Sequence, residues 1–211
     1  MAYDLEEQEK LDAVKAWWKQ YGNLVVGVVL ACSLTVTAVY GWRYYRHQQA
    51  LAAVTLYGQL EQAERTNDSK KVRNIAAQIT DKYAATPYAA LAALAAARAA
   101  FTDGDLAAAK TQLQWVIEHA KEDEMRDVAR LRLAGILLDE KNYAEALKLV
   151  EIKPVESFAG LYADMKGDIL AAQGKVAEAR SAYQQALEKS ASQTAYRQLV
   201  ELKLDALGDA K

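Results

Sequence analysis

The feature that most constrains this chain is an uncharged stretch near its N-terminus, residues 20–42. It begins directly after Lys19 and ends directly before Arg43. A helix of this length, at ~1.5 Å per residue, would span about 34 Å, which exceeds the ~30 Å hydrocarbon core of a bilayer. Its centre is mostly Val, Leu, Ala and Gly. The few hydroxyl groups there can donate to their own helix backbone and are tolerated in lipid. The stretch therefore predicts one transmembrane helix over residues 20–42.

Aromatic residues flank this stretch on both sides, at Trp17, Trp18, Tyr21, Tyr40, Trp42, Tyr44 and Tyr45. Such rings prefer the headgroup layer of a membrane, where an apolar body and a polar tip are both satisfied. The alternative is a cleaved secretory signal, with Val36 and Ala38 as the small residues before the cleavage site. The stretch is longer than the apolar part of ordinary signals and follows an acidic segment, so we favour a retained helix.

The segment before the predicted span, residues 1–19, carries Leu11, Val14 and Trp18 at helical spacing. It forms either a short amphipathic helix in the membrane interface or a frayed polar terminus, and the sequence favours neither. Lysines in this segment slightly outnumber the two arginines that directly follow the span, Arg43 and Arg46. The positive-inside rule therefore weakly favours a cytoplasmic N-terminus.

Within the span, the small residues Gly27, Ala31 and Thr35 recur at intervals of four and share one helical face. Small residues at this spacing allow two helices to approach closely in lipid. We expect this face to contact a transmembrane helix of a partner. The alternative is that these are incidental small residues on a helix that faces lipid.

The remainder of the chain, residues 43–211, is expected to be an all-α domain. The whole chain has only two prolines and ten glycines, too few for the many turns of a sandwich or barrel. Three segments align without gaps, at residues 104–109, 141–146 and 174–179, and each joins two predicted helices. Around the third segment, residues 167–186 place small and large residues in the pattern of a tetratricopeptide repeat (TPR).

The second copy of the repeat is shorter, because Lys153 and Pro154 end its second helix early. Together these patterns predict one N-terminal transmembrane helix followed by a TPR-like domain of helical hairpins. The first helix of each pair would then line a groove that suits an amphipathic helix or an extended apolar segment. The alternative is that several of its leucines belong to the core. The residues expected in the groove are Leu91, Leu94, Arg98, Phe101, Val128, Leu131, Leu138, Leu161, Asp164 and Asp168.

The sequence contains few groups suited to catalysis. His47 and His119 have no second histidine, cysteine or suitably spaced carboxylate to complete a metal site, and the single cysteine, Cys32, lies in the apolar stretch. The glycines are isolated, so no loop is suited to phosphates. From residue 21 onward basic and acidic residues balance, which leaves no basic field for nucleic acid. We therefore expect no catalysis, cofactor, metal or nucleic-acid partner.

The membrane span and the repeat domain also carry a family resemblance. Its most specific stretches are Ala13-Val14-Lys15 leading through Trp18 and Gly22 into the span, Gly41-Trp42-Arg43-Tyr44-Tyr45 at its exit, and Ala179-Arg180-Ser181 followed by Tyr183. With these stretches, nearly the whole chain resembles the YfgM family of bacterial inner-membrane proteins, ancillary subunits of the SecYEG translocon. The resemblance implies a cytoplasmic N-terminus, a periplasmic TPR-like domain, and association with the translocon and the membrane-anchored chaperone PpiD. It implies no catalytic residues.

Two functions are compatible with these features. The first is a membrane-anchored interaction module that contacts the translocon, a PpiD-like chaperone, membrane lipid and newly exported client proteins. The second is a structural scaffold for cell-envelope assembly or division that does not bind exported clients. Partners that co-purify in mild detergent would distinguish the two.

Overall fold

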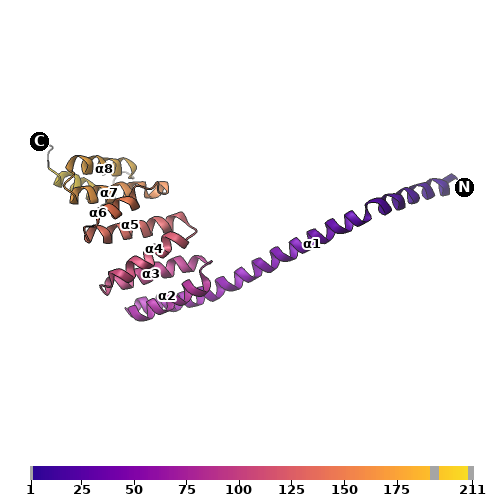
Figure 1. Cartoon of the computed structure of the whole chain (residues 1–211), viewed down its shortest axis with the longest axis horizontal. Coiled ribbons are helices and arrows are strands. Elements are labelled where there is room, and N and C mark those ends of the chain that lie inside the picture. The colour runs from indigo at the N-terminus through magenta and orange to yellow at the C-terminus, as the bar shows by residue number, and fades with distance from the viewer. Residues whose placement is uncertain (1, 191–194, 209–211) are drawn as a thin grey trace. The chain divides into compact units, whose positions relative to one another are not determined.

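A computed structural model describes the backbone of residues 2–190 and 195–208, and the side chains of these residues from position 9 onward. Over that part of the chain every element is a helix and no strand occurs (Figure 1), which confirms the predicted all-α fold. Contacts divide the chain into two compact units, Met1–Gln49 and Ala50–Lys211. The helices are α1 (Ala2–Arg65), α2 (Ser69–Tyr83), α3 (Pro87–Thr102), α4 (Leu106–His119), α5 (Asp123–Asp139), α6 (Tyr143–Val150), the 3-10 helix η1 (Glu156–Phe158), α7 (Ala159–Ala172), α8 (Val176–Lys189) and α9 (Ala195–Ala206).

The first unit is the N-terminal part of α1. Among the described residues, α1 is the one helix long and apolar enough to cross a membrane, and none of its most apolar window is buried. The hydroxyl of Thr35 donates to the carbonyl of Ala31 at 2.8 Å, so this polar group is satisfied within the helix. An exposed apolar helix of this kind is suited to lipid rather than water. The bounds of the span, residues 20–42, stay a prediction.

The second unit begins at Ala50, later than the predicted start of the repeat domain at residue 43. Residues 43–48 are exposed, and burial starts at Ala53. The C-terminal part of α1 then packs through Leu60 and Ala63 into one apolar cluster with α2 and α3. Because the helix is continuous across this boundary, helical periodicity in the sequence does not show where packing begins.

Within the second unit, helical hairpins follow one another: the end of α1 with α2, α3 with α4, α5 with α6, and α7 with α8 (Figure 1). Their four turns share one geometry, with a positive φ at Asn67 (54°), Gly104 (78°), Lys141 (60°) and Gly174 (76°). In each turn the amide of the next residue donates to the carbonyl five residues before it, at 2.8 to 3.0 Å. This is the Schellman ending of a helix, which satisfies carbonyls that have no partner in the helix. The turn at Asn67 is a further copy that the three-segment alignment missed.

The paired helices approach closely because their inner faces carry small residues. Ala100 of α3 and Ala109 of α4 are fully buried in one apolar cluster. In the last pair, Gly167 lies against the ring of Tyr183, and a Cβ built on Gly167 would be 2.5 Å from Cδ1 of that ring and 3.0 Å from Cζ. Only glycine therefore fits at this crossing. The small-and-large pattern predicted over residues 167–186 is thus a packing pattern between α7 and α8.

The third hairpin is irregular because α6 has only 8 residues, whereas α4 and α8 have 14 each. This confirms the early end predicted from Lys153 and Pro154. The link from α6 to α7 is held by Asp127 of α5, which is 1% exposed. Its carboxylate accepts hydrogen bonds from the Val155 amide at 2.8 Å and from the Tyr162 hydroxyl at 2.7 Å. Local sequence patterns gave no sign of this role, because the two partners lie 28 and 35 residues away.

Candidate protein-interaction groove

A hollow of about 380 Å³ lies between α3 and α5, the first helices of two successive hairpins. We call it the α3–α5 groove. Its buried floor is apolar and includes Leu113 and Ile136. Arg98 and Phe101 lie about one turn apart on α3, and Arg132 and Asp139 lie about two turns apart on α5, so each pair shares one face of its helix. The full lining is Ala97, Arg98, Phe101, Leu113, Arg132, Gly135, Ile136 and Asp139.

Two of the predicted groove residues, Arg98 and Phe101, lie together in this hollow. Other predicted residues are more deeply packed. Leu94 is buried in the core shared by α3, α4 and α5, and Val128 packs against the same core. Leu131 and Leu138 are half-buried against the cluster that includes Tyr162 and Ile169, Leu91 is half-buried, and Leu161 is exposed. Arg132, Gly135 and Asp139 of α5 were not anticipated, although the spacing of three and four that unites them can be read in the sequence.

The two predicted acidic residues, Asp164 and Asp168 of α7, are engaged by the C-terminal helix α9. Nζ of Lys203 donates to Asp164 at 2.9 Å and to Asp168 at 2.8 Å. Burial raises the pKa of Asp164 above its usual range, although the hydrogen bond from Lys203 opposes this effect. Burial also lowers the pKa of Lys203, but its hydrogen bonds to the two carboxylates outweigh burial and leave that pKa above the ordinary lysine value. These carboxylates therefore attach α9 to the last hairpin.

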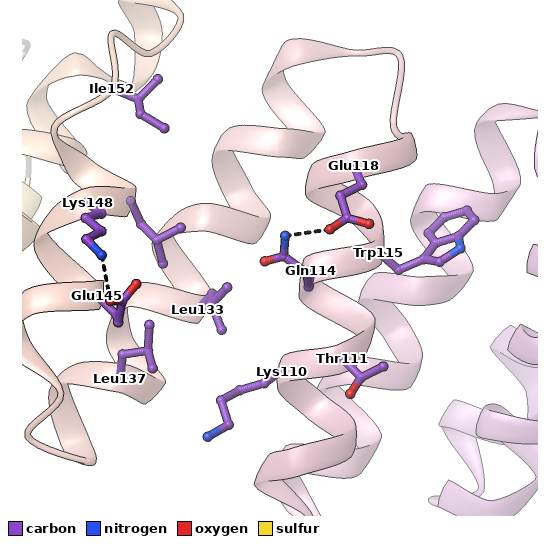
Figure 2. A pocket seen from close by; sticks show the side chains of 11 residues that line it. Lys110, Thr111, Gln114, Trp115, Glu118, Leu133, Leu137, Glu145, Lys148 and Ile152 are labelled. Atoms are coloured by element: carbon purple, nitrogen blue, oxygen red, sulfur yellow. Dashed lines mark hydrogen bonds and ion pairs between the residues drawn. The ribbon is translucent and has the colours of Figure 1, made fainter.

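A second hollow, of about 730 Å³, lies between α4 and α6 (Figure 2). We call it the α4–α6 cleft. Leu133 and Leu137 of α5 line it between the two helices, and Ile152, just after the end of α6, also borders it. The charged groups around it are already partnered. Lys148 donates to Glu145 at 2.7 Å, Gln114 donates to Glu118 at 2.8 Å, and Lys110 forms an ion pair with Glu140 at 2.7 Å.

The described residues contain no group of three or more His, Cys, Asp or Glu that could hold a metal ion. His119 stacks on Trp115 at 4.7 Å between ring centroids, and its Nδ1 lies 2.9 Å from the Trp115 carbonyl. His47 and Cys32 are exposed on α1. The small residues Gly27, Ala31 and Thr35 are also exposed on α1. Their role as a helix-contact face stays a prediction.

Stacked helical hairpins, on a chain that also carries an exposed apolar helix, define a membrane-anchored TPR-like repeat protein. Residues 15–209 match the family described as "Tetratricopeptide repeat-like domain". The chain is 32% identical to the "Ancillary SecYEG translocon subunit" of Neisseria gonorrhoeae, over 98% of this chain and 100% of that protein. Proteins with the same name from Haemophilus influenzae and Escherichia coli are 29% and 30% identical, over 98% and 95% of this chain and 100% and 96% of their own lengths.

These matches extend over nearly the whole chain, so they cover the apolar helix as well as the repeats. The chain belongs to the TPR-like family of proteins named ancillary SecYEG translocon subunits. The predicted family resemblance is thereby confirmed.

Proposed function

We propose that this chain is an ancillary subunit of the SecYEG translocon, a single-pass protein of a bacterial inner membrane whose repeat unit binds other proteins. The observation that carries the proposal is the similarity over nearly the full length to relatives with this name. A stack of helical hairpins is an architecture that presents extended surfaces to partner proteins, and it fits a protein that catalyses no reaction.

The two units contribute different parts of this function. The repeat unit offers the α3–α5 groove, where Phe101 is 50% exposed beside Arg98. The apolar helix confines that groove to the membrane, which raises its effective concentration near a membrane-embedded partner. Binding at the membrane then requires less intrinsic affinity than binding from solution.

We further propose that the N-terminus lies in the cytoplasm and the repeat unit in the periplasm. Lys10, Lys15 and Lys19 support this orientation through the positive-inside rule. The repeat unit contains no cysteine, which suits an oxidising compartment. Association with a PpiD-like membrane chaperone, and help to newly exported proteins, are proposed on the family resemblance of the sequence.

Within the span, the proposed contact with a partner's transmembrane helix uses Gly27, Ala31 and Thr35. Replacing Gly27 and Ala31 by leucine adds bulk where close approach is needed and should weaken a co-purifying complex. The matched control replaces Val29 and Val36, on the opposite face, by leucine. Equal recovery of every partner with both pairs of substitutions would refute this contact.

The experiment that tests the function is purification of the full-length tagged chain from bacterial membranes in mild detergent, followed by mass spectrometry of its partners. We expect the subunits of SecYEG to co-purify. Recovery of division or wall-synthesis proteins without the translocon would instead support a scaffold for the cell envelope.

A further inference from the structure

The arginines of the repeat unit divide into two groups. Five of the eight arginines in this unit have an acceptor: Arg73, Arg126, Arg130 and Arg197 form ion pairs, and Arg180 donates to the carbonyl of Gly208. The other three, Arg65, Arg98 and Arg132, form no ion pair with any described residue, and two of them, Arg98 and Arg132, line the α3–α5 groove. Their guanidinium donors are therefore available to a ligand.

Around these two arginines the groove is lined mostly by apolar residues and by one acidic residue, Asp139. Phe101 follows Arg98 by about one turn of α3 and is half exposed. Gly135 contributes no side chain to the groove, and a Cβ built there would meet nothing closer than Cε of Met165 at 3.9 Å. The one acidic residue in the lining is Asp139, so the groove has an excess of positive charge.

This set of groups defines the chemistry of a ligand. A guanidinium presents a planar fork of donors that matches the two oxygens of a carboxylate. An exposed phenylalanine ring gains most from covering an aliphatic or aromatic side chain. We propose that the α3–α5 groove binds a segment of a partner protein in which an acidic side chain lies next to an apolar one. The inference rests on the proposed interaction function and adds the chemistry of the ligand to it.

The test uses the full-length chain in nanodiscs of zwitterionic lipid. The probe is a fluorescein-labelled peptide of twelve residues in which glutamate alternates with leucine and phenylalanine, and the matched peptide has glutamine at each glutamate. Both are amidated at the C-terminus, so that side chains supply the only carboxylates. Fluorescence anisotropy should show that the glutamine peptide binds about tenfold more weakly or worse, because it lacks the charge-assisted hydrogen bonds.

Variants of the chain locate the site. Arg98→Gln and Arg132→Gln should each weaken binding of the glutamate peptide roughly tenfold, while Phe101→Ala should weaken binding of both peptides. The control is Arg65→Gln, because Arg65 is exposed at the end of α1 and lies outside the groove. Circular dichroism checks that each variant stays folded. If the arginine variants do not fold, the comparison of the two peptides on the unmodified chain still decides the question.

Three results would overturn the proposal. They are equal affinity for the two peptides, no binding at millimolar peptide, and a loss of peptide affinity in Arg65→Gln as large as in the Arg98 and Arg132 variants. Displacement of the peptide by nanodiscs that contain phosphatidylglycerol, dependent on Arg98, would assign the groove to a lipid headgroup and would also overturn it. Translocon co-purification is measured separately, so failure of peptide binding while the translocon still co-purifies refutes the ligand and leaves the proposed function standing.

Discussion

Replacing Gly167 by alanine should destabilise the repeat unit, although alanine is the better helix former. The added Cβ would be 2.5 Å from Cδ1 of Tyr183, about 1 Å closer than carbon atoms ordinarily pack. The ring cannot move away freely, because Tyr183 is buried and its hydroxyl donates to Asp168 at 2.8 Å. Overpacking of this kind costs ~1–3 kcal/mol and a weakened hydrogen bond about 1 kcal/mol more, against a gain of about 1 kcal/mol in helix propensity. We expect a net loss of about 2 kcal/mol.

The control is the same substitution at Gly58, in the part of α1 that belongs to the repeat unit. A Cβ there meets nothing within 4 Å, so Gly58→Ala should stabilise by about 0.5–1 kcal/mol. Urea unfolding of the full-length chain in mild detergent, followed by circular dichroism at 222 nm, measures both. In a double-mutant cycle, Tyr183→Leu should remove most of the cost of Gly167→Ala, a coupling of more than ~1 kcal/mol. If the two glycine substitutions shift stability in the same direction, the close approach of α7 and α8 is not the reason for glycine at position 167.

Three further predictions follow from the turns, the C-terminal helix and the anchor. Lys141 adopts a positive φ of 60° where two other turns have glycine, a conformation that is strained for lysine. Lys141→Gly should therefore raise the free energy of unfolding, measured with urea, by ~0.5–1 kcal/mol. A lower free energy of unfolding would show that the backbone of Lys141 is not strained. Because the hydrogen bonds of Lys203 raise its pKa above the ordinary value of 10.5, the stability it contributes is present below that pH and is lost as pH rises through the higher folded-state pKa. Lys203→Met should therefore lower the free energy of unfolding by about 2–3 kcal/mol at pH 7. It should also reduce the loss of stability that the unmodified protein shows at alkaline pH. An unchanged dependence of stability on pH would show that Lys203 does not attach α9. The apolar helix should be retained, so mass spectrometry of the mature protein should find the whole chain, and a chain that begins near Val39 would contradict this.

The sequence allowed most of the architecture to be predicted, because helix periodicity and turns are local properties. The turns at Gly104, Lys141 and Gly174 align because each needs a positive φ followed by a capping position. The turn at Asn67 was missed because asparagine adopts the positive φ where two other copies have glycine, and the only residue it shares with another copy at the aligned positions is Asp68, which stands where the first copy has Asp105. The early end of α6 was predicted for an equally local reason, since proline removes a backbone donor.

The candidate site was predicted less completely, because depth of burial depends on distant neighbours. Leu94 and Phe101 lie on the same helix, yet Leu94 is in the core and Phe101 is half exposed. The pairing of Asp164 with Lys203 joins residues that are 39 positions apart, and no local pattern indicates it. The α4–α6 cleft is lined by residues of three helices that lie far apart in the sequence, so no local pattern indicates it.

The shared turn geometry has a consequence for how such a chain can change over generations. Each turn is closed by backbone hydrogen bonds that reach only about five residues back, so the geometry of each turn is determined by residues next to it in the sequence. The turns at Asn67, Gly104 and Lys141 are evenly spaced along the chain, and a duplicated or deleted segment of that length leaves the backbone hydrogen bonds of every remaining turn in place. Duplication or deletion of such a segment can therefore change the number of first helices without requiring a new kind of turn. In such lineages the number of side chains offered to a partner changes by whole modules, while the chemistry at each existing position evolves on its own.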